Sequence, residues 1–267
     1  MKMRLEISGE GMPLVIVGGG LTGVLSWTTH AERLSPRHHM ALAQPLGVQM
    51  GLENVPLPAN YSVRMESRAL AASLDEIGWT DPIDLVGWSY GGLIALDFAL
   101  ERPERVRSLV LVEPDAAWSL PDYGRSDAEV RKVEEDALRW ADGVTEDDLA
   151  AMMSEMLGPG QSPREHSRWP VWSAHRNALR TSSAIFRHHD DVARLRRFSK
   201  PVLLFKGEGT PRYYAVIVDT LARAFPIVRL VELPGGHMAP IVAADLFLEE
   251  MEAFQRTPAS PPADHSR

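Results

Sequence analysis

Cysteine is absent from the 267 residues of this chain. Its absence excludes a cysteine nucleophile, a disulfide framework and any cysteine-ligated metal site. An excess of positive charge is also missing, because 28 lysine and arginine residues face 36 aspartate and glutamate residues and leave a formal charge of −8. This balance argues against nucleic acid or anionic lipid as a partner, and it favours a neutral or apolar small-molecule substrate.

Long hydrophobic runs are missing as well. No apolar stretch approaches the roughly 20 residues that a membrane-spanning helix needs. Charge appears already at Lys2 and Arg4, too early for the apolar region of a signal peptide. We therefore expect a cytoplasmic protein with no membrane partner, while its oligomeric state stays unknown from composition.

The chain does contain short apolar runs that alternate with helical patterns. Continuous apolar character, as in Leu14-Val15-Ile16-Val17, is typical of strands buried on both faces of a parallel sheet. The expected strands are residues 14–17, 40–43, 83–87, 106–112, 201–205 and 228–233, and the expected helices between them are residues 63–77, 91–101, 212–225 and 240–254. This alternation predicts an α/β fold with a mostly parallel central sheet flanked by helices.

The alternation is interrupted between residues 116 and 197. This stretch has helical patterns but no convincing strand; the expected helices are residues 128–141, 146–157, 172–179 and 183–195. We therefore predict a core of residues 1–115 and 198–256, with residues 116–197 inserted as a helical cap. Residues 257–267, rich in proline, are expected to be a disordered tail.

A sharp strand-to-helix turn is predicted at Gly87-Trp88-Ser89-Tyr90-Gly91, which matches G-x-S-x-G. Small residues two positions before and after the serine allow strand and helix to approach each other, and the turn exposes the serine hydroxyl. A glycine-rich turn carrying a serine by chance is the simpler explanation. The apolar strand before the motif and the apolar helix after it favour Ser89 as a nucleophile.

With this motif the chain resembles the α/β-hydrolase superfamily over nearly its whole length, apart from the cap and the tail. The resemblance implies a general-base histidine just after the last strand, where Gly235-Gly236-His237-Met238 lies. His237 is therefore the expected base. The runs His38-His39 and His188-His189-Asp190-Asp191 are interpreted as solvated turns, so no metal site is expected.

The same resemblance places an oxyanion hole after the first buried strand, at Gly18-Gly19-Gly20-Leu21. The expected donors are the backbone amides of Gly20 and Tyr90, with Leu21 as the alternative to Gly20. Glycines 18, 20 and 23 also match a dinucleotide fingerprint, but no acidic residue closes a second strand at the expected distance. We therefore expect no cofactor.

The triad acid departs from the commonest pattern. Most relatives carry an aspartate in the loop that follows the cap and the next strand, but this chain reads Gly207-Glu208-Gly209-Thr210-Pro211 there. The other position known in the superfamily is the end of the strand after the elbow helix, as in zearalenone-lactonase-like enzymes. Glu113 lies there and is the expected acid; Asp115 and Glu208 are the alternatives.

An aromatic and methionine-rich cap favours an apolar acyl or lactone substrate, although packing between cap helices is the simpler role for such residues. The candidate substrate contacts are Trp88, Leu21, Trp118, Met153 and Trp172. Together these features predict a serine hydrolase, an esterase or lactonase acting through an acyl-enzyme. C–C bond hydrolysis, acyl transfer and perhydrolysis could use the same groups, and a non-catalytic binding or receptor protein is the alternative from another class.

Overall fold

The fold is known from a computed structural model that describes residues 1–157 and 160–256. A single seven-stranded sheet has the order β1-β3-β2-β4-β5-β6-β7. Its strands are β1 (Arg4–Ser8), β2 (Met12–Val17), β3 (His38–Gln44), β4 (Ile83–Trp88), β5 (Val106–Val112), β6 (Val202–Gly207) and β7 (Val228–Leu233). All neighbours pair in parallel except β1, which is antiparallel to β3. The predicted mostly parallel sheet is therefore confirmed.

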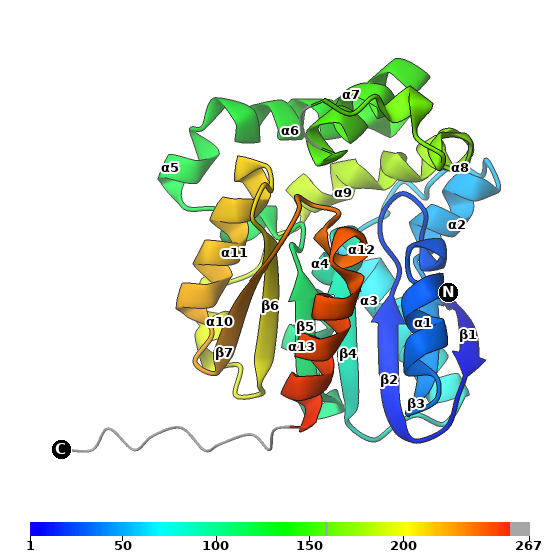
Figure 1. The fold of residues 1–267 in the computed structure, drawn as a ribbon, viewed down its shortest axis with the longest axis vertical. Coiled ribbons are helices and arrows are strands. Elements are labelled where there is room, and N and C mark those ends of the chain that lie inside the picture. Colours follow the sequence, from blue (N-terminus) through cyan, green and yellow to red (C-terminus); the bar gives the residue numbers. More distant parts are fainter. Residues whose placement is uncertain (158–159, 257–267) are drawn as a thin grey trace.

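Helices cover both faces of this sheet (Figure 1). One face carries α3 (Val63–Glu76), α4 (Tyr90–Glu101) and α11 (Arg212–Ala224), and the other carries α1 (Thr28–Leu34) and α13 (Ala244–Arg256). Each face of the sheet packs against its helices as a separate hydrophobic core, and β2 contributes to both. Val15 and Val17 pack into the core with α3, α4 and α11, whereas Leu14 and Ile16 pack into the core with α1 and α13.

Between β5 and β6 the described chain forms helices only. These are α5 (Asp122–Arg125), α6 (Ala128–Arg139), α7 (Glu146–Leu157), α8 (Trp169–His175), α9 (Ser182–Arg187) and α10 (Val192–Arg197), with short 3₁₀ turns between them. Helices α6 to α9 lie across the carboxyl ends of the strands (Figure 1). We call α5 to α9 the inserted helices. The boundaries of a separate cap at residues 116 and 197 remain our proposal.

Several elements differ from the sequence prediction. The helix expected over residues 183–195 is two helices, because the chain is extended after α9 and Asp191 caps α10 through the Ala193 amide at 2.8 Å. The helix expected over residues 240–254 also divides, into α12 (Ala239–Val242) and α13, with the break at Ala243. The predicted tail of residues 257–267 lies outside the described residues.

Three short elements had no clear sequence signal. Strand β1 is a mostly exposed edge strand, and α1 is only seven residues long. Helix α2 (Leu46–Leu52) contains two glycines, which lower helix propensity. Tertiary packing decides such segments: a Cβ on Gly51 would lie only 2.5 Å from Ala178 Cα.

Candidate active site

Ser89 lies at the turn between β4 and α4, as the motif predicts. Its backbone is in the positive-φ region, with φ 57° and ψ −125°, an energetically unfavourable conformation for a residue with a side chain. The turn is possible because its glycines have no side chains, since the neighbouring backbone leaves no room for a Cβ atom at either position. A Cβ on Gly91 would lie 2.4 Å from the carbonyl oxygen of Gly18, and one on Gly87 would lie 2.4 Å from that of Gly91.

Glu113 is the carboxylate that faces His237. Its Oε2 lies 2.7 Å from Nδ1 of His237, which follows strand β7. Glu113 itself comes directly after β5, has a φ of 40° and is 1% exposed. Its other oxygen, Oε1, accepts the amide of Gly207 at 2.7 Å. The carboxylate is thereby held in the position that orients a histidine base.

Thr210 occupies part of the loop where most relatives carry the acid. Its hydroxyl donates to Oε2 of Glu113 at 2.7 Å, so the loop supports the glutamate instead of supplying a carboxylate. The alternative Glu208 in the same loop is exposed, and its backbone amide bonds to Leu233. The sequence alternatives are thus separated by where each carboxylate lies.

Asp115, the other alternative, lies against the serine and not against Nδ1 of the histidine. The Ser89 hydroxyl donates to Oδ2 of Asp115 at 3.1 Å, and the Asp115 amide donates to the Ser89 carbonyl at 3.2 Å. Burial raises the pKa of Asp115 to about 6, although nearby His237 and hydrogen bonds from Ser89 and Tyr214 oppose the increase. The site therefore holds two acidic groups: Glu113 faces the histidine, and Asp115 faces the serine.

Two tyrosines of α11 complete the surroundings of these acids, and sequence reasoning did not single them out. The Tyr214 ring stacks on the imidazole of His237, with centroids 4.0 Å apart and planes 18° apart. Burial raises the pKa of Tyr214 and of Tyr213 well above the ordinary value for tyrosine. The sequence indicates them only by their place at the start of the helix that follows the loop of residues 207–211. On the other side, Trp88 Nε1 donates to the His237 carbonyl at 3.1 Å.

The loop after β2 lies beside the serine. A Cβ on Gly20 would lie 3.1 Å from Tyr90 Cβ, so the two expected oxyanion donors are neighbours. The Tyr90 hydroxyl is anchored at 2.8 Å to that of Tyr61, which hydrogen-bonds to the buried Glu66. The chain after Gly23 forms a short 3₁₀ turn, with no long helix opening at the third glycine as a dinucleotide site requires.

A cavity under the inserted helices contains Ser89, His237 and Asp115 on its floor. Four of the five predicted substrate contacts line it: Leu21, Trp88, Met153 and Trp172. The prediction for Trp118 is wrong, because its ring packs into the core with residues of α4 and α11. Trp118 belongs to the buried 3₁₀ turn at Ala117–Ser119, which precedes the inserted helices. The remaining wall is mostly apolar, so the cavity suits an apolar substrate.

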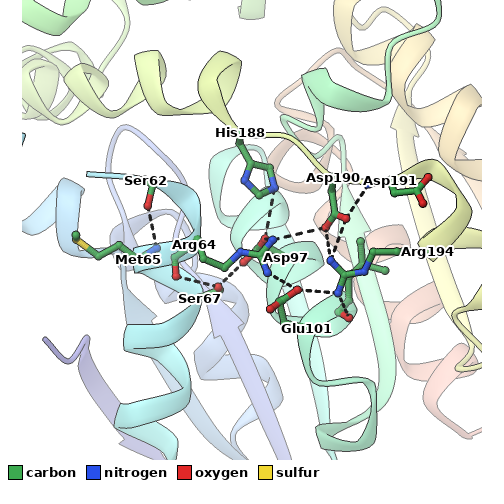
Figure 2. Close-up of polar contacts among 11 residues, drawn as sticks. Ser62, Arg64, Met65, Ser67, Asp97, Glu101, His188, Asp190, Asp191 and Arg194 are labelled. Atoms are coloured by element: carbon green, nitrogen blue, oxygen red, sulfur yellow. Dashed lines mark hydrogen bonds and ion pairs between the residues drawn. The ribbon is translucent and has the colours of Figure 1, made fainter. Parts of the chain in front are cut away.

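Figure 2 shows a second cluster of titratable groups, whose members His188, Asp97 and Asp190 do not line this cavity. Nε2 of His188 lies 3.4 Å from Oδ1 of Asp97, and Asp190 is close enough to both to suggest a metal site. However, Arg64 lies 3.2 Å from Asp97 and Arg194 lies 2.9 Å from Asp190. The two arginines already supply positive charge, so we assign no ion here. The expected solvated turns are wrong for His188, which is buried, and for His38, which is buried at the start of strand β3.

Within the described residues, none of the helices combines the length and the apolar character that crossing a bilayer requires.

Comparison with known proteins places this fold and site in a class. A family model described as the alpha/beta hydrolase fold matches residues 12–244. The chain is similar to the 2-hydroxy-6-oxo-2,4-heptadienoate hydrolase of Pseudomonas putida, at 34% identity over 166 residues. That alignment spans 57% of this chain and 58% of the relative. Similarity to the putative carbamate hydrolase RutD of Azorhizobium caulinodans is 27% over 270 residues, or 93% of each protein.

Solved structures agree on the architecture. The enol-lactonase from Burkholderia xenovorans LB400 superimposes with a TM-score of 0.77 at 17% identity, covering 96% of both chains. A thermophilic esterase from Thermogutta terrifontis gives the same TM-score at 19% identity, covering 95% of this chain and 93% of the other. This chain belongs to the alpha/beta-hydrolase fold family. Within it, the protein is a hydrolase, as its sequence resemblance predicts.

Proposed function

We propose that this hydrolase cleaves a carboxylic ester or lactone, with Ser89 as nucleophile, His237 as general base and Glu113 as the acid that orients the histidine. The observation that supports this proposal is the 2.7 Å contact between His237 and Glu113 beside a serine at a strained turn. A carboxylate at Nδ1 leaves Nε2 as the proton acceptor and stabilises the imidazolium once it forms. All three residues come from separate segments, so their meeting is a property of the fold.

Acylation begins when the Ser89 hydroxyl turns from Asp115 to His237. The histidine takes the proton as the serine oxygen attacks the carbonyl carbon, and a tetrahedral oxyanion forms. The amides of Gly20 and Tyr90 stabilise this charge, and each such donor typically contributes 100- to 1,000-fold, or about 3 kcal/mol, to the rate. His237 then protonates the leaving alcohol, which for a lactone stays attached to the acyl chain.

Deacylation uses the same groups in reverse. A water molecule gives its proton to His237 and attacks the acyl carbon. The second tetrahedral intermediate then collapses, and His237 returns the proton to the departing Ser89 oxygen as the acid is released. The apolar wall formed by Met153 and Trp172 excludes bulk water from the acyl chain and favours an uncharged one.

The test is turnover of a panel of p-nitrophenyl esters and lactones by the wild type, Ser89→Ala and Glu113→Gln. The wild type should be active. Ser89→Ala should lose at least about 10⁴-fold in kcat, and Glu113→Gln about 10³- to 10⁴-fold, because the histidine loses its correct tautomer. The matched control is Glu208→Gln, a neighbouring glutamate that is exposed, and it should keep wild-type activity.

An organophosphate gives an independent readout, since a serine hydrolase should be labelled once per chain on Ser89. A protein that is neither labelled nor active on any ester would be a binding module. Full activity of Glu113→Gln would contradict the triad.

C–C bond hydrolysis is the second candidate. The observation that favours it is the 34% identity to a hydrolase named for 2-hydroxy-6-oxo-2,4-heptadienoate. To distinguish the two candidates, kcat/KM is measured for a 2-hydroxy-6-oxodienoate and for the best ester of the panel. A much higher kcat/KM for the dienoate would overturn the ester assignment and keep the role of Ser89.

A further inference from the structure

The carboxylate of Asp115 touches the reacting hydroxyl, yet the triad does not use it. Its Oδ2 lies 3.1 Å from Oγ of Ser89, while Glu113 already serves Nδ1 of His237. Asp115 is 6% exposed and belongs to the floor of the cavity. A buried carboxylate without a counter-ion is unfavourable unless its oxygens accept hydrogen bonds.

Tyr213 adds a second polar group with no use in the triad. Its side chain is 1% exposed, it lines the same cavity, and its hydroxyl has no hydrogen-bond partner among the described residues. Burial and then the charge of Asp115 raise the pKa of Tyr213, so its hydroxyl keeps its proton. An unpaired buried hydroxyl is a feature that a bound ligand can satisfy.

The proposed reaction itself removes a hydrogen bond from Asp115. In the free protein Ser89 donates to this carboxylate. During attack the serine proton passes to His237, so Asp115 loses a donor at the moment when its surroundings are driest. A substrate that brings its own donor to this place restores the lost bond, whereas a purely apolar acyl chain leaves the carboxylate with Tyr214 as its side-chain donor.

We propose that Asp115 and Tyr213 form a polar subsite that selects substrates carrying a hydroxyl or N–H group on the first or second carbon beyond the scissile carbonyl. This inference rests on the proposed ester or lactone hydrolysis. The short reach follows from geometry. An oxygen 3.1 Å from the attacking atom can accept a hydrogen bond, of about 2.7 Å, only from groups close to the carbonyl carbon. The Asp115 carboxylate accepts a hydrogen bond from the substrate's hydroxyl or N–H group, and the Tyr213 hydroxyl donates to a lone pair of that same substrate group.

The test compares p-nitrophenyl butyrate with p-nitrophenyl 2-hydroxybutyrate and 3-hydroxybutyrate. For each protein the measured quantity is the kcat/KM of a hydroxy ester divided by that of the plain ester. Comparing this ratio between proteins cancels the intrinsic reactivity of the esters. Asp115→Ala should lower the ratio roughly 10- to 100-fold for at least one hydroxy ester, as expected for a hydrogen bond to a charged group.

Two further variants keep the test decisive. Asp115→Asn preserves the shape of the side chain and should lower the ratio less than alanine does, because its carbonyl oxygen still accepts. Tyr213→Phe should lower the ratio several-fold, about the effect of one neutral hydrogen bond. The control is Asp136→Asn, a carboxylate on the cavity wall that is already paired with Lys132 and Arg139, and it should leave the ratio unchanged.

The outcomes separate this inference from the proposed function. If the wild type hydrolyses all three esters through Ser89 and both Asp115 variants keep its ratio, the subsite is refuted while ester hydrolysis stands. If the wild type hydrolyses none of them, ester hydrolysis fails and the subsite fails with it. A ratio that falls in both Asp115 variants but not in Asp136→Asn supports the subsite.

Discussion

At the scale of single residues, the two acids near Ser89 have different hydrogen-bond partners. Glu113 accepts hydrogen bonds from Gly207, Thr210 and His237, so its negative charge is well solvated by the protein. Asp115 lies in the cavity floor, where burial raises its pKa to about 6. Two carboxylates that are two residues apart in the chain therefore have different partners and different surroundings.

This difference predicts a pH-dependent stability gain for Asp115→Asn. The native pKa of about 6 exceeds the ordinary 3.8, so the native state binds more protons than the unfolded state between about pH 4 and pH 6. Stability of the wild type therefore falls as the pH rises through this window. The variant lacks the buried charge and should be more stable by about 3 kcal/mol above pH 6, from roughly two pKa units at about 1.4 kcal/mol each.

Urea unfolding of both proteins at pH 4, 5, 6, 7 and 8 measures the difference. The expected result is near-equality at pH 4 and a growing advantage of Asp115→Asn toward pH 7. An advantage that is constant across the series would show that the substitution acts through packing rather than through the charge. A stability gain at neutral pH combined with altered substrate selectivity is the usual exchange at a functional site.

At the scale of elements, the elbow depends on three strands and one helix approaching each other closely. Gly18, the residue directly after β2, supplies the carbonyl against which helix α4 begins, and the carbonyl of Val112 in β5 accepts the Ser89 amide at 2.9 Å. The serine conformation, with φ 57°, is thus maintained by neighbours on both sides. A small change in the distance between β2 and α4 should act directly on the nucleophile.

Gly91→Ala tests this dependence. The added methyl group would lie 2.4 Å from the Gly18 carbonyl oxygen, a backbone atom that cannot move aside independently. We expect a loss of roughly 1–3 kcal/mol in stability from overpacking, together with a large decrease in kcat. Gly209→Ala is the control, since its methyl group would meet its nearest neighbour at 3.6 Å, an ordinary contact. Chemical denaturation and ester turnover give both readouts; unchanged turnover in Gly91→Ala would contradict the argument.

At the scale of the whole molecule, a partly buried network of ion pairs joins the segment after α9 to the sheet domain (Figure 2). Arg64 of α3 contacts Asp97 and Glu101 of α4, and Arg194 of α10 contacts Glu101 at 2.7 Å and Asp190 at 2.9 Å. Asp97 is fully buried, and Ser67 donates to it. The network therefore ties the end of the inserted helices to the core.

Arg64→Met should weaken this connection, because it leaves buried Asp97 without its nearest cation. Breaking a buried pair costs about 3–5 kcal/mol, and the partial exposure of Arg64 reduces the expected loss to roughly 1–3 kcal/mol. Urea denaturation measures the loss, and limited proteolysis should cut the inserted helices earlier than in the wild type. Arg164→Met is the control. Its pair with Asp147 is exposed on both sides, so we expect a change below about 0.5 kcal/mol.

The sequence by itself determined the features that depend on local pattern. Apolar runs buried on both faces predicted the central strands, and the G-x-S-x-G pattern predicted the sharp strand-to-helix turn at Ser89. His237 and Glu113 were implied by the resemblance to the α/β-hydrolase superfamily, and both lie after parallel strands whose ends meet at one edge of the sheet. The strands and the turn need only chain order and periodicity, which the sequence contains.

Tertiary structure alone decided which acid meets which partner. Asp115 and Glu113 are two residues apart, and only the path of the backbone after β5 directs one toward Ser89 and the other toward His237. Tyr214 reaches the histidine, and Trp118 turns into the core, through packing between segments distant in the chain. The physical reason is that side-chain direction and long-range packing depend on how helices seat against the sheet, and no local pattern encodes that arrangement.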